Sequence, residues 1–205
     1  MQPITILNYK SGNLRAITNV FDQIGCRYVI AENPKQLNEP CKIVLPGVGA
    51  FDQAMLQLES SGMVEALSDL VIRKRVPILG ICVGMQILGT SSDEGLRSGL
   101  GWIPGKVKKI ENQAGCLRLP HMGWNDVTPN HDEPLFSGMS APRFYFLHSY
   151  YFDCNDRRNV SATVEYGSTF PCAVRSANIF GVQFHPEKSH QFGAQLLKNF
   201  AELKC

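Results

Sequence analysis

The sequence has no apolar run long enough to cross a bilayer, and its first residues lack the basic region and apolar stretch of a signal peptide. It has no basic patch with interleaved aromatic residues, and its formal net charge is only +2, so nucleic acid is not an expected partner. The 7 cysteines are scattered and contain no Cys-x-x-Cys pair, which argues against a disulfide framework or a zinc knuckle. We therefore expect a cytoplasmic protein that binds no membrane, nucleic acid or metal.

What is present fits one ordinary globular domain over residues 1–205, with 44% hydrophobic residues to form a core. Short apolar runs at 4–7, 28–30, 43–45 and 78–81 predict buried strands. They alternate with segments of helical spacing at 14–24, 51–58 and 63–73. Continuous apolar strands that alternate with helices predict a mostly parallel sheet covered on both faces.

The second half has a different pattern. Residues 91–142 are rich in glycine, proline and short strands, such as 106–110, and predict an irregular or antiparallel section at a sheet edge. Further strands are predicted at 144–147, 160–164 and 179–184, and a closing helix at 191–203. The expected fold is therefore α/β, with three layers and a doubly wound, mostly parallel sheet that carries an antiparallel edge section.

The functional prediction depends on the pattern Gly80-x-Cys82-x-Gly84, which follows an apolar run and precedes apolar residues at helical spacing. It predicts a strand, a sharp turn and a helix, which is a cysteine version of the nucleophile elbow. Glycines two positions either side remove side chains that would collide there. The thiol would lie at a helix N-terminus, where a thiolate is favoured, and the next amide could face an oxyanion. A cysteine that is simply buried is the ordinary alternative.

A cysteine nucleophile needs a base, and the sequence offers 5 histidines. His185 follows a predicted strand, and Glu187 lies two residues on, across the rigid Pro186. This turn can bring the carboxylate to one imidazole nitrogen and leave the other nitrogen for Cys82. Parallel strands end at one sheet edge, which would gather these groups. A surface turn or a metal pair is the alternative, although no third ligand accompanies the two residues.

Three other stretches could contribute to a site. The glycine-rich turn at 46–51 exposes successive amides that could hold an oxyanion, or it is a plain strand–helix turn or a phosphate loop. His148 follows a predicted strand and is a second, weaker candidate base. Residues 121–125 combine polar and aromatic groups around a glycine, which is typical of a contact surface or of a packed loop with Trp124 buried.

Together these stretches resemble the class I, or triad, glutamine amidotransferases. Asn8-Tyr9-x-x-Gly12-Asn13-Leu14 and residues 46–51, 80–86, 120–125, 145–150 and 183–188 occur in the family's order over nearly the whole chain. The elbow and the His-Pro-Glu turn mark the whole family. The stretches at 120–125 and 145–150 are more specific to members that serve histidine biosynthesis. Val83 departs from the family's usual leucine, but its backbone amide is the functional group, so activity is still expected.

The resemblance implies that the chain hydrolyses glutamine and passes ammonia to a partner subunit, a (β/α)8-barrel cyclase, in a heterodimer without metal or organic cofactor. It implies a catalytic triad of Cys82, His185 and Glu187. It further implies oxyanion donors at Gly47, Val48, Gly49 and Val83. Glutamine contacts are implied at Gln86 and at the backbone of His148, Ser149 and Tyr150, and partner contacts at Asn13, Met122, Trp124, Asn125, Tyr145 and Lys188.

A free glutaminase would waste glutamine, so we hypothesise that the oxyanion loop is unformed until the partner binds its own ligand. Three alternatives stay open. A paralogous subunit could supply ammonia to another acceptor, for example in surface-sugar amidination. A cysteine hydrolase could act alone on γ-glutamyl compounds. A binding or scaffold subunit could carry an inactive triad, although the three residues are all present.

Overall fold

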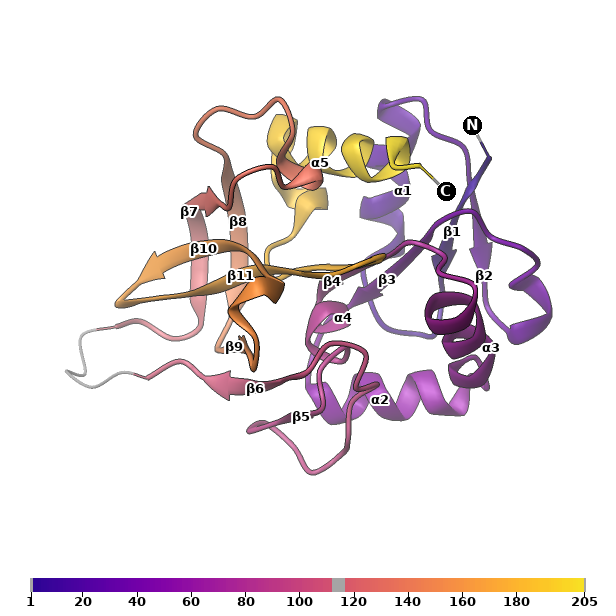
Figure 1. Cartoon of the computed structure of the whole chain (residues 1–205), viewed down its shortest axis with the longest axis horizontal. Coiled ribbons are helices and arrows are strands. Elements are labelled where there is room, and N and C mark those ends of the chain that lie inside the picture. Colours follow the sequence, from indigo (N-terminus) through magenta and orange to yellow (C-terminus); the bar gives the residue numbers. More distant parts are fainter. Residues whose placement is uncertain (1, 112–116, 205) are drawn as a thin grey trace.

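The computed structural model describes residues 2–111 and 117–204. Four strands of its first half and β12 near its C-terminal end form the parallel part of a nine-stranded sheet, in the order β2-β1-β3-β4-β12 (Figure 1). The residues of β1, β3, β4 and β12 are all buried, as their continuous apolar sequences predict. The strands are β1 (Ile4–Leu7), β2 (Tyr28–Ala31), β3 (Ile43–Gly47), β4 (Ile78–Cys82) and β12 (Ile179–Val182).

The sheet continues on the far side of β12 with antiparallel strands, in the order β11-β10-β7-β8. A separate three-stranded sheet, in the order β5-β6-β9, lies beneath this extension (Figure 1). The predicted mixture of a parallel core and an antiparallel section is thus confirmed. These strands are β5 (Ser91–Ser92), β6 (Gly105–Lys109), β7 (His121–Pro129), β8 (Arg143–His148), β9 (Tyr150–Cys154), β10 (Val160–Tyr166) and β11 (Ser168–Ser176).

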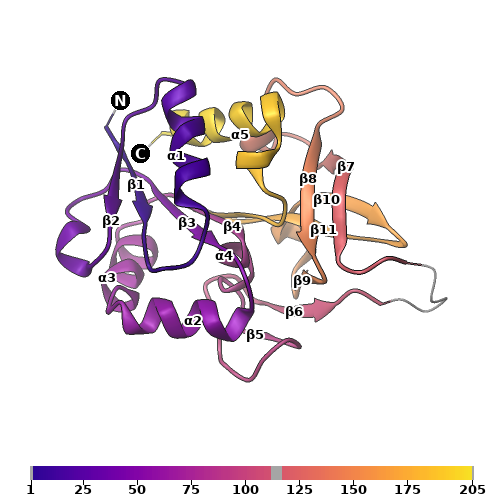
Figure 2. The same cartoon turned by 180° about the vertical axis from the view of Figure 1, so that it is seen from behind.

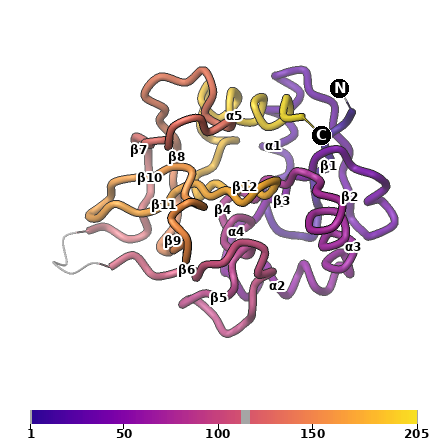
Figure 3. The backbone as a smooth tube through the Cα atoms, viewed as in Figure 1, coloured from indigo at the N-terminus to yellow at the C-terminus, as the bar shows by residue number. Residues whose placement is uncertain are grey.

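Helices cover both faces of the parallel part, which gives the expected layers (Figures 1 and 2). The helices α1 and α5 lie on one face, and α2 and α3 lie on the other. The start of β1 and the end of α5 lie side by side (Figure 3). The α-helices are α1 (Leu14–Gln23), α2 (Phe51–Ser60), α3 (Val64–Ser68), α4 (Val83–Gln86) and α5 (His190–Glu202). Short 3-10 turns are η1 (Pro34–Gln36), η3 (Pro134–Phe136), η4 (Arg157–Asn159) and η5 (Pro186–Lys188), and a π-helical turn, η2 (Asp69–Arg73), follows α3.

Two boundaries differ from the sequence prediction in ways that matter for the site. The third strand was expected to stop at Pro46, but β3 runs on because its parallel register with β4 extends to the pair Gly47–Cys82. Residues 121–125 were expected to form a loop, but they begin β7, in which His121 and Val127 are buried while Met122 is exposed. The mixed polar and aromatic sequence concealed this alternation.

The scattered spacing of the cysteines argued against a disulfide framework, and the structure departs from this expectation at one described cysteine. Cys26, Cys82, Cys154 and Cys172 are free, whereas Cys41 is disulfide-bonded. A disulfide requires two cysteines to be close in the folded chain, which sequence spacing cannot reveal. Cys116 and Cys205 lie outside the described residues.

Among the helices of the described residues, none is long and apolar enough to cross a membrane.

Candidate functional site

Cys82 ends β4 at the turn that leads into α4, and its backbone is held at φ 55° and ψ −115°. This left-handed conformation is unusual for a residue with a side chain. The flanking glycines make the turn possible, because a Cβ on Gly80 would lie 2.6 Å from the carbonyl oxygen of Gly84, and a Cβ on Gly84 would overlap the carbonyl oxygen of Leu45. The helix that follows, α4, is a single turn, so its dipole is small. The electrostatic environment of the sulfur is therefore set mainly by neighbouring side chains.

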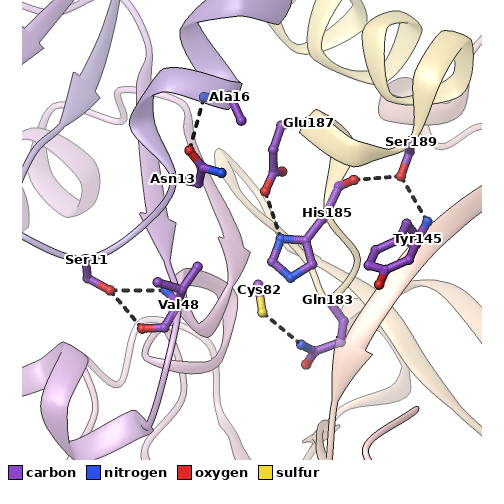
Figure 4. Close-up of polar contacts among 10 residues, drawn as sticks. All are labelled: Ser11, Asn13, Ala16, Val48, Cys82, Tyr145, Gln183, His185, Glu187 and Ser189. Atoms are coloured by element: carbon purple, nitrogen blue, oxygen red, sulfur yellow. Dashed lines mark hydrogen bonds and ion pairs between the residues drawn. The ribbon is translucent and has the colours of Figure 1, made fainter. Parts of the chain in front are cut away.

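His185 and Glu187 approach Cys82 from the segment that follows β12. His185 Nδ1 lies 2.8 Å from Glu187 Oε1, and the two side chains are only 4% and 2% exposed. The other ring nitrogen faces the sulfur of Cys82 (Figure 4). The backbone N–H of His185 donates to the carbonyl of Tyr145 over 2.9 Å, which fixes the turn to β8. The structure therefore brings thiol, imidazole and carboxylate into one line.

The protonation of His185 follows from these neighbours. Burial by itself lowers the pKa of this imidazole, but the hydrogen bonds and charges of Cys82 and Glu187 outweigh burial and raise the pKa to about 10. His185 is thus an imidazolium at neutral pH, poised to give a proton to a leaving group. Glu187 Oε2 is buried and has no hydrogen-bond partner among the described residues, so this carboxylate is committed to the imidazole through one oxygen.

The sulfur opens into a cavity of about 340 Å³, a size typical of a small-molecule site. The predicted residues that line it come from four segments that are far apart in the sequence. These residues are Val48, Gly49, Cys82, Val83, Gln86, His148, Ser149, Tyr150, His185 and Lys188. Gly47 pairs with Cys82 in the sheet below the cavity.

Within the described part of the chain, no group of three or more His, Cys, Asp or Glu side chains could hold a metal ion.

Two residues that the sequence analysis did not single out belong to this site. Gln183 is fully buried, and its Nε2 donates to the sulfur of Cys82 over 3.7 Å while its Oε1 accepts from Gln86 Nε2 over 3.0 Å. Glu94 lines the cavity, and its Oε2 accepts the backbone N–H of Phe51 over 2.8 Å. Gln183 had a signal, since it is a polar residue at the end of an apolar strand. Glu94 lay in the irregular middle section and had none.

The glycine-rich turn after β3 is tied to the loop after β1. The amide of Val48 donates to Ser11 Oγ over 3.1 Å, and the Ser11 hydroxyl lies 3.1 Å from the Val48 carbonyl, to which it can donate (Figure 4). Ser11 is 4% exposed, whereas Val48 is 44% exposed. Gly49 has φ +90°, which favours glycine at this position. The Val48 amide, one of the predicted oxyanion donors, is therefore occupied by Ser11.

Some of the predicted partner residues present apolar side chains to solvent, and others use their polar groups within the chain. On β7, Met122 is 66% exposed and Trp124 is 38% exposed, and Met122 pairs with Leu147, which lines the cavity. Trp124 stacks on His190 at a centroid distance of 5.1 Å, and Lys188 Nζ lies 5.5 Å from the centre of the Tyr145 ring. By contrast, the side chain of Asn13 caps α1 by accepting the N–H of Ala16 over 3.2 Å, and that of Asn125 donates to the Glu165 carbonyl over 2.9 Å.

Comparisons with known proteins agree with this geometry. The family model for "Glutamine amidotransferase class-I" matches residues 5–203. The "Imidazole glycerol phosphate synthase subunit HisH" of Bdellovibrio bacteriovorus is 50% identical over 203 residues, covering 98% of this chain and 100% of the relative. The protein of the same name from Leptospira interrogans is 51% identical with the same coverage. Among solved structures, a "glutamine amidotransferase" covers 97% of both chains with a TM-score of 0.76 and 18% identity, and "PurLQS from Thermotoga maritima" covers 98% of both with 0.73 and 21%.

Proposed function

The chain belongs to the class I glutamine amidotransferase family, and on this premise we propose that it is the glutaminase subunit of an imidazole glycerol phosphate synthase. The observation that carries the proposal is the line of Cys82, His185 and Glu187, of which Cys82 and His185 line a small cavity. The full-length similarity to relatives with that name supports the assignment to histidine biosynthesis. The reaction is the hydrolysis of glutamine to glutamate and ammonia.

In the first half of the reaction, the thiolate of Cys82 attacks the carboxamide carbon of glutamine and forms a C–S bond. Backbone amides, including that of Val83, stabilise the oxyanion of the tetrahedral intermediate. The imidazolium of His185 then protonates the departing nitrogen, the C–N bond breaks, and ammonia leaves. A glutamyl thioester and a neutral imidazole remain.

In the second half, His185 takes a proton from water, and the hydroxide attacks the thioester carbon. The C–S bond breaks, glutamate leaves, and the thiolate–imidazolium pair is restored. Glu187 holds the proton of His185 on Nδ1 throughout, so that Nε2 can exchange a proton with the substrate. Water and glutamine are consumed, and glutamate and ammonia are formed.

Recognition of glutamine follows from the charges that face the cavity. The carboxylate of Glu94 is a complement for the α-ammonium group, and Lys188 is a complement for the α-carboxylate. The strand end at Ser149 and Tyr150 offers backbone groups, and Gln86 is held against the Tyr150 carbonyl over 3.3 Å.

Ammonia is useful to an acceptor only while it is unprotonated, so we expect it to leave through a partner rather than through water. The exposed Met122, Trp124 and Leu147 form an apolar surface at the edge of the cavity, which favours a partner subunit over a hydrolase that acts alone. The partner that we propose is a (β/α)8-barrel cyclase that forms a heterodimer with this chain.

The contact between Ser11 and Val48 supports the hypothesis of an oxyanion loop that is unformed in the free chain. As long as Ser11 holds the Val48 amide, that amide cannot donate to the oxyanion. Rotation of the peptide would release it toward the cavity, and Gly49 permits the backbone change. Binding of the partner and its ligand would favour the released state, which makes glutamine hydrolysis depend on the acceptor.

The test is glutamate release from glutamine by the chain alone, and by the chain mixed with a histidine-pathway cyclase and that subunit's nucleotide ligand. We expect strong stimulation by the liganded partner. The variant Cys82→Ala should lose glutamine-dependent synthesis, and the complex should keep synthesis from added ammonia. Loss of both activities would show that Cys82 is structural or that the ammonia route is wrong.

The same assay addresses the paralogous alternative. Two relatives at 42% identity carry the name "HisH 2", in Pseudomonas aeruginosa and Methanococcus maripaludis, so numbered subunits of this kind exist. If a glutamine-mimicking electrophile labels Cys82 but the cyclase gives no stimulation, the acceptor is a different one.

A further inference from the structure

The side chains of two buried histidines in the antiparallel section take no part in the reaction steps described above, although His148 belongs to the lining of the cavity. His121 and His148 are 3% and 6% exposed and face each other across the β7–β8 pair. His121 Nδ1 lies 3.0 Å from His148 Nε2. His121 is stacked between two aromatic rings, at 4.7 Å from Phe146 and 3.9 Å from Tyr166. These contacts fix both rings without a charged partner.

The hydrogen-bond partners at the two ends determine where the protons lie. His148 Nδ1 is 2.7 Å from the carbonyl oxygen of Tyr150, which can only accept, so His148 carries its proton on Nδ1. In a neutral ring its Nε2 must then accept, and His121 must donate from Nδ1. The remaining nitrogen, His121 Nε2, is left to accept from Asn125 Nδ2 at 3.4 Å. Burial lowers the pKa of His121 to about 4 and that of His148 to about 3, so both rings are neutral near pH 7.

Tyr150 is where this chain of imidazoles meets the glutamine site. Its carbonyl accepts from His148 and also from Gln86 Nε2, over 3.3 Å, and the same Nε2 donates to Gln183. Both Gln86 and Tyr150 line the cavity. The position of the Tyr150 carbonyl therefore sets the position of the Gln86 amide, and the imidazoles set the position of that carbonyl.

At its other end, the series of hydrogen bonds through the two imidazoles reaches Asn125 on β7, the strand that also carries the exposed Met122 and Trp124. Asn125 is on this strand and anchors to the Glu165 carbonyl with the same nitrogen that approaches His121. Each bond in the series has one donor and one acceptor, so no member can reverse its direction alone.

We propose that His121 and His148 are a pair of positioning residues that hold the Tyr150 carbonyl, and through it Gln86, in the geometry that binds glutamine. The inference rests on the proposed glutaminase function for its kinetic consequence, but its hydrogen-bond order can be tested without that function. His148 is the direct support, and His121 fixes the tautomer of His148.

The kinetic test uses matched variants that both remove the ring. His148→Asn places an amide nitrogen close to the position of Nδ1 and keeps a donor for Tyr150, whereas His148→Gln places its amide near Nε2 and loses that donor. In the complex with the cyclase, we expect KM for glutamine to stay within about threefold in His148→Asn and to rise about tenfold in His148→Gln. We expect kcat to change by less than threefold in both. Equal changes in KM for the two variants, or a loss confined to kcat, would overturn the proposal.

The structural test uses the wild-type chain with 15N-labelled histidine. Near pH 7, two histidines should show the neutral Nδ1–H tautomer in the imidazole 15N spectrum. One signal should be lost in His148→Asn, and the other should be lost when His121 is replaced. An Nε2–H tautomer or a protonated ring at either position would overturn the proposal. Because the tautomers are measured in the wild-type chain, this outcome counts even if the variants fail to fold. If the wild-type complex releases no glutamate while the tautomers are as expected, the proposed function fails and the hydrogen-bond order stands.

Discussion

The contact between Ser11 and Val48 gives the sharpest prediction about catalysis. The change Ser11→Ala removes the hydroxyl that accepts the Val48 amide and lies near the Val48 carbonyl, each at 3.1 Å. It adds no bulk, and the Val48 peptide lies beside the cavity, where water or an oxyanion can take over as acceptor. We expect the loop to release the amide more often in the free chain, and glutamine hydrolysis without partner to become faster.

The size of the effect follows from the bonds removed. A hydrogen bond of this type contributes about 0.5–1.5 kcal/mol net, so the two contacts together hold the loop by about 1–3 kcal/mol. Each 1.36 kcal/mol corresponds to about a tenfold change in rate if hydrolysis requires the released state. The basal rate should therefore rise by roughly 5- to 150-fold. The partner-stimulated rate should change less than about twofold, because the liganded partner already favours the released state.

The assay is glutamate release by Ser11→Ala and by the control Ser11→Thr, which keeps the hydroxyl, each measured with and without the liganded cyclase. Ser11→Thr should retain the low basal rate. A basal rate of Ser11→Ala equal to wild type, with full stimulation, would show that Ser11 does not restrain the loop. A fall in both rates would show that Ser11 supports the catalytic geometry instead.

Three further predictions concern the triad and the partner surface. Glu187→Gln should lower kcat by about 10²–10⁴ with little change in KM, because the neutral amide does not stabilise the imidazolium and can present its NH2 group to Nδ1, which then loses its proton. Single-turnover glutamate release would measure the loss, and an effect on KM alone would contradict this reasoning. Because the pKa of His185 is raised to about 10 from an unfolded value of about 6.5, its protonated form stabilises the fold fully below pH 6.5 and loses this contribution as pH rises through 10. Unfolding of wild type and His185→Gln by denaturant from pH 6 to 10 should show the difference in stability shrinking with pH, and a constant difference would refute it. Trp124→Ala should weaken cyclase binding by about 30-fold in calorimetry while basal hydrolysis is kept, and unchanged binding would place the interface elsewhere.

The parallel half of the fold could be read from the sequence because its signals are local. Continuous apolar runs predicted β1, β3 and β4, and helical spacing predicted α1, α2 and α5, each to within a few residues. The elbow was equally local, since its glycines at positions 80 and 84 flank Cys82. The His-Pro-Glu turn places a carboxylate beside an imidazole within three residues.

The antiparallel half was harder because its strands mix polar and aromatic residues, and their pairing joins distant segments. β7 was expected to be a loop at 121–125 for this reason, and β9 and β11 gave no clear pattern. The disulfide at Cys41 likewise depends on which cysteine folding brings close.

The sequence by itself therefore determined the family, the parallel core and the residue types that could perform the chemistry, because each depends on neighbours a few positions apart. The tertiary structure decided what surrounds them. Ser11 meets Val48 across 37 residues, Glu94 meets Phe51 across 43, and Gln183 meets Cys82 across 101. Such contacts form only when the loops after the strands gather at one edge of the sheet, and no local pattern of residues encodes which side chains will face each other there.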